Sequence, residues 1–139
     1  MAPLKILAAA LSCVALVACG GGDSGPNQQP SSGPFAVTLQ SGAPAVIASE
    51  GLSLTLTAVD DSRCPAAAIC VWAGEAVARI GIVQNGQAPA SLSLSTAPDK
   101  GTASYRGYRV NLVGVEPYPV TTTPILLDQY RINLRIDKS

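Results

Sequence analysis

The chain contains no histidine, and its single methionine is Met1. Zinc, blue-copper and haem sites that depend on imidazole or thioether ligands are therefore excluded. A serine or threonine nucleophile also needs an activating base, and histidine, the usual base, is missing. We therefore predict a protein that is not an enzyme and that uses no cofactor and no metal ion.

Charged residues are also scarce. They make up 13% of the chain, with nine basic and nine acidic residues in balance. The charges are scattered, and no basic stripe interleaved with aromatic residues is present. Nucleic-acid binding lacks its electrostatic basis, so we expect no nucleic-acid partner.

The longest apolar run lies near the N-terminus. Ile6–Ala18 follows Lys5 and is too short to cross a bilayer core of about 30 Å as a helix, which indicates a signal peptide. Leu16-Val17-Ala18-Cys19 resembles the lipobox of bacterial lipoproteins. The resemblance implies removal of residues 1–18 and lipidation of Cys19. An ordinary signal peptide is the alternative, but Leu16 fits its small-x-small cleavage pattern less well.

The residues that follow predict how the protein is placed. Gly20 stands where an aspartate commonly retains Gram-negative lipoproteins at the inner membrane, so we expect the outer membrane. Gly20–Pro34 is rich in glycine, serine and proline and has no apolar periodicity, which predicts a flexible tether over residues 19–34. Such a coil of about 15 residues reaches roughly 20 Å.

Residues 35–139 show alternating apolar and polar positions, as expected of half-buried antiparallel strands. The alternating segments are 35–40, 52–59, 75–83, 91–95, 108–115 and 130–136, with a short strand near 45–48. Asn85-Gly86 predicts a type I′ hairpin, and Gly107 suggests a bulge. The pattern predicts an all-β domain, an antiparallel β-sandwich of the immunoglobulin-like or a related kind, with about seven or eight short strands.

Two of the four cysteines remain after the leader and the lipid are accounted for. Cys64 and Cys70 are spaced C-x5-C, which matches neither a zinc ribbon nor a C-x-x-C redox motif. An even pair in an exported protein favours a disulfide. A redox-active pair and a two-thiolate metal site remain as alternatives.

The residues around these cysteines offer further candidates. We expect Trp72 to start a strand and to pack in the core against the disulfide, with an exposed binding aromatic as the alternative. Asp60 and Asp61 suit turns or salt bridges with Arg63 or Arg79, more than a calcium site. Glu75 could pair with Asp61 in hydrolytic chemistry, although nothing beyond their presence supports it.

Tyrosine and arginine gather in the C-terminal third, and both are enriched at binding hot spots. They are also ordinary outward-facing strand residues, which we favour. The possible binding residues are Arg63, Trp72, Tyr105 and Tyr108.

The run Asp61-Ser62-Arg63-Cys64-Pro65, followed after four residues by Cys70-Val71-Trp72-Ala73-Gly74, resembles a motif of an uncharacterised family of small bacterial secreted proteins and lipoproteins. The resemblance implies a β domain with a short disulfide loop. It implies no activity.

Three hypotheses of function follow. The first is a lipid-anchored envelope protein whose non-enzymatic β domain binds an envelope protein or polysaccharide, or serves a structural role. The second is a protease-inhibitor-like module that presents Arg63-Cys64-Pro65-Ala66-Ala67 on the disulfide-braced loop. The third is an envelope enzyme that uses carboxylates.

Overall fold

The structure is a computed structural model that describes residues 33–139. The predicted signal peptide, the lipidation site Cys19 and most of the tether lie outside the described residues. The described part contains eight strands: β1 (Phe35–Leu39), β2 (Ala45–Ile47), β3 (Leu52–Asp61), β4 (Ala76–Gln84), β5 (Ala90–Ser95), β6 (Thr102–Tyr105), β7 (Tyr108–Glu116) and β8 (Arg131–Lys138). Two single-turn 3-10 helices, η1 (Ala48–Glu50) and η2 (Leu127–Gln129), complete it, and no helix there could cross a membrane.

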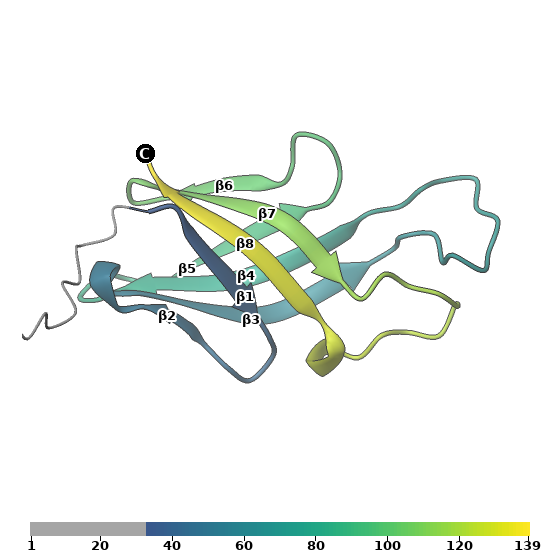
Figure 1. Ribbon diagram of the computed structural model, residues 1–139, viewed down its shortest axis with the longest axis horizontal. Helices are drawn as coiled ribbons and strands as arrows, with labels where there is room; N and C mark the ends of the chain where they lie inside the picture. The colour runs from purple at the N-terminus through teal and green to yellow at the C-terminus, as the bar shows by residue number, and fades with distance from the viewer. Residues whose placement is uncertain (1–32) are drawn as a thin grey trace, which may run out of the picture.

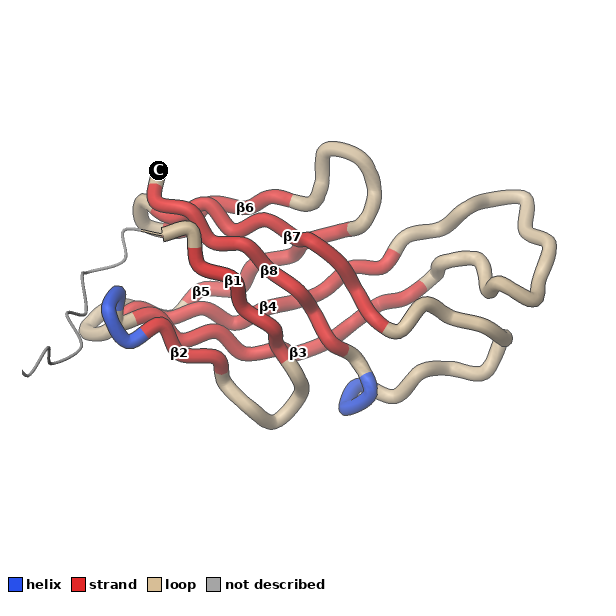
Figure 2. Tube along the Cα trace, in the orientation of Figure 1, coloured by secondary structure: helices blue, strands red, loops and turns tan. Residues whose placement is uncertain are grey.

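The strands form two antiparallel sheets of four, in the orders β1-β8-β7-β6 and β2-β3-β4-β5 (Figures 1 and 2). This confirms the predicted all-β sandwich. The chain passes between the sheets only twice, from β1 to β2 and from β5 to β6. The strands therefore follow one another around the sandwich in chain order. An immunoglobulin domain instead divides its strands as ABED and CFG, so this sandwich is a related type.

The core lies between the two sheets and comes from the alternation that the sequence displays. On β3, for example, Leu52, Leu54 and Leu56 are buried, while the residues between them are partly exposed. Successive strand side chains point to opposite faces, so this alternation buries one face of each sheet. The fully buried side chains of the core include Leu39, Leu54, Ile80, Leu94, Val110, Ile132 and Ile136.

Three tyrosines belong to this core, and the expectation that they face outward is wrong. Tyr105, Tyr108 and Tyr130 are all nearly inaccessible. The hydroxyl of Tyr108 donates a hydrogen bond to Glu50 in η1, which connects β2 and β3 of the opposite sheet. The hydroxyl of Tyr105 donates to the carbonyl of Ala88. Each ring fills the interior while its hydroxyl finds a partner at the edge, as buried tyrosines generally require.

Two hairpin turns differ from the sequence prediction. The Asn85-Gly86 turn forms between β4 and β5, but only Gly86 has a positive φ, 74°, so the turn is not type I′. The type I′ pattern occurs between β6 and β7, where Arg106 and Gly107 have φ values of 43° and 82°. Gly107 thus lies in a tight turn rather than a bulge.

Long loops gather at one end of the sandwich. The β3–β4 connection, residues 62–75, contains both cysteines and is called here the disulfide loop. The β7–β8 connection, residues 117–130, is called the proline loop. Figure 1 shows both loops projecting at the right-hand end, while the C-terminus and the start of the described chain lie at the left-hand end. The sandwich thus separates its long loops from its chain entry.

Candidate functional site

The disulfide loop begins as a continuation of the β3–β4 hairpin. The amide of Ser62 donates to the carbonyl of Glu75 at 2.8 Å, and the amide of Cys64 donates to the carbonyl of Ala73 at 2.9 Å. Gly74 has a φ of 68°, and a Cβ added there would lie 1.8 Å from the carbonyl oxygen of Ser62. Only glycine allows the two chains to approach this closely, so Gly74 fixes the base of the loop.

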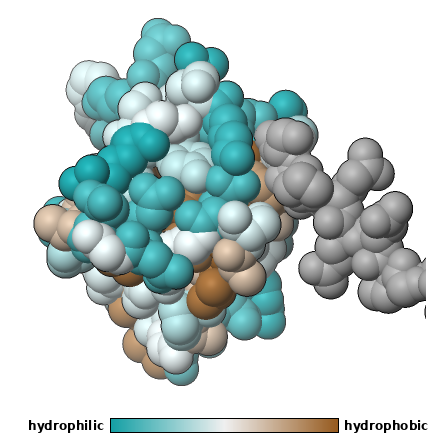
Figure 3. Space-filling view, turned by 90° about the vertical axis from the view of Figure 1, so that its left-hand side faces the viewer, coloured by the Kyte–Doolittle hydropathy of each residue, from teal (hydrophilic) through white to brown (hydrophobic). Residues whose placement is uncertain are grey.

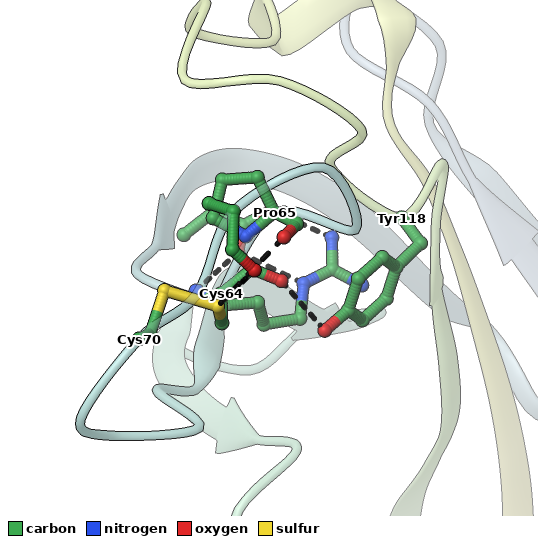
Figure 4. Close-up of a disulfide and its surroundings, with 7 residues drawn as sticks. Cys64, Pro65, Cys70 and Tyr118 are labelled. Atoms are coloured by element: carbon green, nitrogen blue, oxygen red, sulfur yellow. Dashed lines mark hydrogen bonds and ion pairs between the residues drawn. A yellow bond between two sulfur atoms is a disulfide. The ribbon is translucent and has the colours of Figure 1, made fainter.

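The outer part of the loop is closed by the predicted disulfide. Cys64 and Cys70 are bonded, with their Cα atoms 5.9 Å apart (Figure 4). Inside the small ring, the amide of Ala68 donates to the carbonyl of Pro65 at 2.9 Å. In the chain-entropy model, closing so short a ring stabilises the fold by about 2 kcal/mol. The disulfide confines the loop instead of bracing the core.

Main-chain hydrogen bonds join the disulfide loop to the proline loop. The amide of Ala66 donates to the carbonyl of Pro119, and the amide of Ala67 donates to the carbonyl of Val120, each at 2.9 Å. The hydroxyl of Tyr118 donates to the carbonyl of Cys64 at 2.9 Å (Figure 4). The two loops therefore form one unit, although more than fifty residues separate them in the sequence.

Arg63 lies beneath this unit and holds it to the sandwich. Its Nε and Nη2 donate to the two carboxylate oxygens of Asp61 at 2.8 and 2.6 Å. Its Nη1 donates to the carbonyl of Val115, and its Nη2 also donates to the carbonyl of Pro117, both at 2.8 Å. The guanidinium carbon is 4.9 Å from the ring centroid of Tyr118. Asp61, Arg63, Tyr118 and Tyr130 are called here the clamp.

The clamp shifts the protonation equilibria of its members. Burial raises the pKa of Tyr130 to about 12, together with the hydrogen bond that its hydroxyl donates to Asp61 at 3.0 Å. Burial alone would raise the pKa of Asp61, but the hydrogen bonds from Arg63 and Tyr130 prevail and the pKa is lowered. The same pairing with Asp61 raises the pKa of Arg63. Asp61 is therefore an ionised structural anchor, with its oxygens already occupied.

These contacts show the surroundings of three sequence candidates. The side chain of Arg63 is only 8% exposed, which is far from the open loop position that an inhibitor hypothesis needs. Glu75 contacts Ser95 and Lys100, so it does not share a cleft with Asp61. Asp60 pairs with Arg79 at 2.7 Å, as the sequence suggested. Among residues 33–139, no cluster of three acidic or cysteine residues could hold a metal ion.

Trp72 is the clearest correction. It was expected in the core at the start of a strand, but it is 82% exposed and lies in the loop, before β4 begins at Ala76. The disulfide loop projects past the end of the sheets, where no core remains to cover the ring. Trp72 is therefore exposed, as the alternative prediction had it. Tyr105 and Tyr108, the other aromatic candidates, are buried and offer no surface to a partner.

Trp72 is one of a group of exposed apolar side chains. Its neighbours Ile69 and Val71 are almost fully exposed, and Val120 of the adjoining loop is 63% exposed. Ile69, Val71, Trp72 and Val120 are called here the apolar tip. Six of the eight large exposed hydrophobic residues in the described chain belong to the two loops. The opposite end, seen in Figure 3, is mostly hydrophilic, with scattered apolar spots.

Hollows also occur in the described surface, away from the tip. One of about 300 Å³ lies over strands β1, β8 and β7 and is lined mainly by apolar groups, among them Val37, Val113 and Leu134. Another hollow, of about 680 Å³, lies between the β5–β6 turn and β7. Polar side chains along it bond to protein groups: Thr102 donates to Asn111 at 2.9 Å, and Ser95 donates to Glu75. A hollow of about 180 Å³ lies between the loops, beside Asp61 and Tyr130, and is smaller than usual ligand pockets of roughly 300 Å³ or more.

No family model, no curated protein and no solved structure matches this chain. The geometry of the loops therefore carries the functional argument. Nothing in the sequence periodicity indicated the tip. One feature of the sequence could have indicated it: no charged residue occurs between Cys64 and Gly74, although the strand pattern leaves this segment in a loop.

The clamp predicts unequal effects of two neighbouring aspartates. Asp61→Ala leaves the buried guanidinium of Arg63 without its counter-ion, so we expect a loss of about 3 kcal/mol in the free energy of unfolding. Asp60→Ala breaks only an exposed ion pair and should cost less than about 1 kcal/mol. Urea unfolding of both variants checks this. Equal losses would contradict the buried clamp.

The clamp also predicts an alkaline transition. The pKa of Tyr130 is about 12 in the folded protein, above the value of about 10 for an unfolded tyrosine, so its contribution to stability is complete below pH 10. That contribution is lost as the pH rises from about 10 to about 12. Tyr130→Phe should remove the tyrosinate absorbance step near pH 12, whereas the control Tyr118→Phe should retain it. A step that persists in Tyr130→Phe would assign it elsewhere.

Proposed function

We propose that this protein is a lipid-anchored component of a bacterial envelope, in the outer membrane, and that its β domain binds a partner without catalysing a reaction. The observation that supports this most is the apolar tip. Several large apolar side chains exposed in one part of a protein surface are uncommon unless they serve an interaction. The exposed ring of Trp72 is of the residue type most often found at binding hot spots.

The way the tip is held agrees with a binding role. The disulfide, the Ala66 and Ala67 hydrogen bonds and the clamp restrict the two loops before any partner arrives. A surface that is already ordered loses less conformational entropy on association. These contacts fix the disulfide loop, although none of its residues belongs to the hydrophobic core, which favours a role for its conformation in recognition.

The position of the tip fits an anchored protein. The described chain begins at Gly33, at the end of the sandwich away from the two loops (Figure 1). If Cys19 carries lipid, the chain enters the domain from the membrane side. The tip can then face away from the anchor, where an envelope partner can reach it. The resemblance of the cysteine motif to small bacterial lipoproteins agrees with this setting.

The other two hypotheses have less support. An inhibitor of a trypsin-like protease needs a free Arg63 side chain, whereas this guanidinium bonds to Asp61, Val115 and Pro117. An enzyme based on carboxylates needs Asp61 and Glu75 in one cleft, whereas each has different partners. We therefore propose binding rather than inhibition through Arg63 or hydrolysis.

The anchor is tested by lipid labelling. Cys19→Ala should abolish incorporation of a labelled fatty acid and release the protein from the membrane fraction, because the acyl chains supply the membrane affinity. The matched control is Cys13→Ala, which should keep both the label and the location. Labelling that survives in Cys19→Ala would contradict the lipoprotein assignment.

Binding is tested in intact envelopes of the native host. A photo-cross-linking amino acid is placed, one position at a time, at Trp72, Val120, Val46 and Val113, which are all exposed. We expect a discrete adduct at one or more positions. The adduct should not form when the envelopes are extracted with detergent before irradiation. The absence of an adduct at every position would contradict a binding function.

A further inference from the structure

The apolar tip is uncharged over a long stretch of chain. No charged side chain occurs in residues 64–74 or 117–127, which include all four members of the tip. Of the charged residues next to these two stretches, Arg63 pairs with Asp61 and Glu75 pairs with Lys100. Glu116 and Asp128 are exposed at the two ends of residues 117–127. A partner that is recognised through ion pairs would find no charged group within the tip itself. The tip suits an apolar contact.

The main chain of the tip is equally distinctive. Within the described residues, no hydrogen bond involves a backbone N–H or C=O of Ile69, Cys70, Val71 or Trp72. Ile69 is the last residue inside the disulfide ring, Cys70 closes the ring, and Val71 and Trp72 lead back to the hairpin base, where the amide of Cys64 bonds to Ala73. The segment 69–72 therefore presents unpaired main-chain donors and acceptors beside exposed apolar side chains.

This combination argues against two classes of occupant. Inserting segment 69–72 into lipid would bury unsatisfied backbone groups, each at a cost of several kcal/mol. The tip also lacks the lysines and arginines that attract anionic headgroups. A polysaccharide offers many hydroxyls, and Thr121, Thr122 and Thr123 beside Val120 are exposed and could bond some of them. Residues 64–71, which include Ile69 and Val71, contain no polar side chain to bond the others. Trp72 alone could stack on a sugar ring.

A protein can satisfy both features of the tip. An exposed sheet edge or an extended cleft wall supplies main-chain donors and acceptors, and an adjacent hollow takes side chains, as in strand-addition complexes. The tip projects from the end of the sandwich, and projecting loops commonly insert into concave sites. Shape, lack of charge and unpaired backbone thus point to one kind of partner.

We propose that the partner is a protein with an apolar cleft bordered by unpaired main-chain groups, and that segment 69–72 pairs with that main chain. Ile69 and Trp72 supply the side chains that fill the cleft, while Val120 covers its edge. This inference rests on the proposed binding function and names the partner class and the residues that meet it.

The test uses the full lipidated chain in intact envelopes, with the photo-cross-linker at position 72 and, as a control, at Val113 on the exposed face of β7. We expect a protein adduct from position 72 and none from position 113. The cross-linked protein is identified by mass spectrometry and purified. Its Kd for the full chain should rise at least about tenfold with Trp72→Ala and remain unchanged with Val113→Ala.

The role of the main chain needs a second pair of variants. Val71→Pro removes one backbone N–H of the segment, whereas Val71→Thr keeps the side-chain shape and the N–H. We expect at least about tenfold weaker binding for Val71→Pro than for Val71→Thr. Circular dichroism checks that both variants keep the fold. A protein mass that does not change on alkylation without reductant checks that both keep the disulfide. Equal affinities would overturn main-chain pairing.

The other outcomes separate this inference from the proposed function. Adducts from position 72 to lipid, to glycan or to a second copy of this chain would overturn the inferred partner class but leave a binding function in place. The same holds for adducts from Val113 or Val46 with none from the tip. If no position gives an adduct, the binding function fails, and this inference fails with it.

Discussion

The pairing of Arg63 with Asp61 is the interaction on which the loop end depends. Asp61 is the last residue of β3, whereas Val115, which accepts a hydrogen bond from Arg63, belongs to β7 of the other sheet. One guanidinium thus connects both sheets and the start of the proline loop. Such a buried pair is costly to desolvate, but breaking it is costlier, because the remaining charge stays buried. The pair therefore fixes where the loops leave the sandwich.

A second polar network closes the opposite end. Glu50 of η1 accepts a hydrogen bond from the hydroxyl of Tyr108 in β7, and its carboxylate lies 2.9 Å from the amino group of Lys138 in β8. This network again joins the two sheets. The ends differ in what they support, because one carries short turns and the chain entry, whereas the other carries two long loops and the apolar tip. The asymmetry gives the domain one end suited to a partner.

The strands were predictable because each depends on local alternation, and the disulfide was predictable because two cysteines remained in an exported chain. The Trp72 prediction was wrong because burial depends on what lies across from a residue, and the loop extends beyond the sheets. The same limit explains Tyr105 and Tyr108, whose hydroxyls reach partners contributed by other turns. Strand β6 was missed because it is only four residues long and ends in a turn with Arg106 at positive φ.

The sequence by itself determined the all-β class and the approximate positions of all strands but β6. It favoured the Cys64–Cys70 disulfide, and for Asp60 and Asp61 it offered turns or salt bridges with Arg63 or Arg79 without assigning the partners. Period-two patterning and residue type act locally and need no knowledge of distant segments. The tertiary structure alone decided that Arg63 is buried, that Trp72 is exposed and that residues 62–75 and 117–130 form one unit. Those outcomes depend on contacts between segments more than fifty residues apart, which no local pattern records.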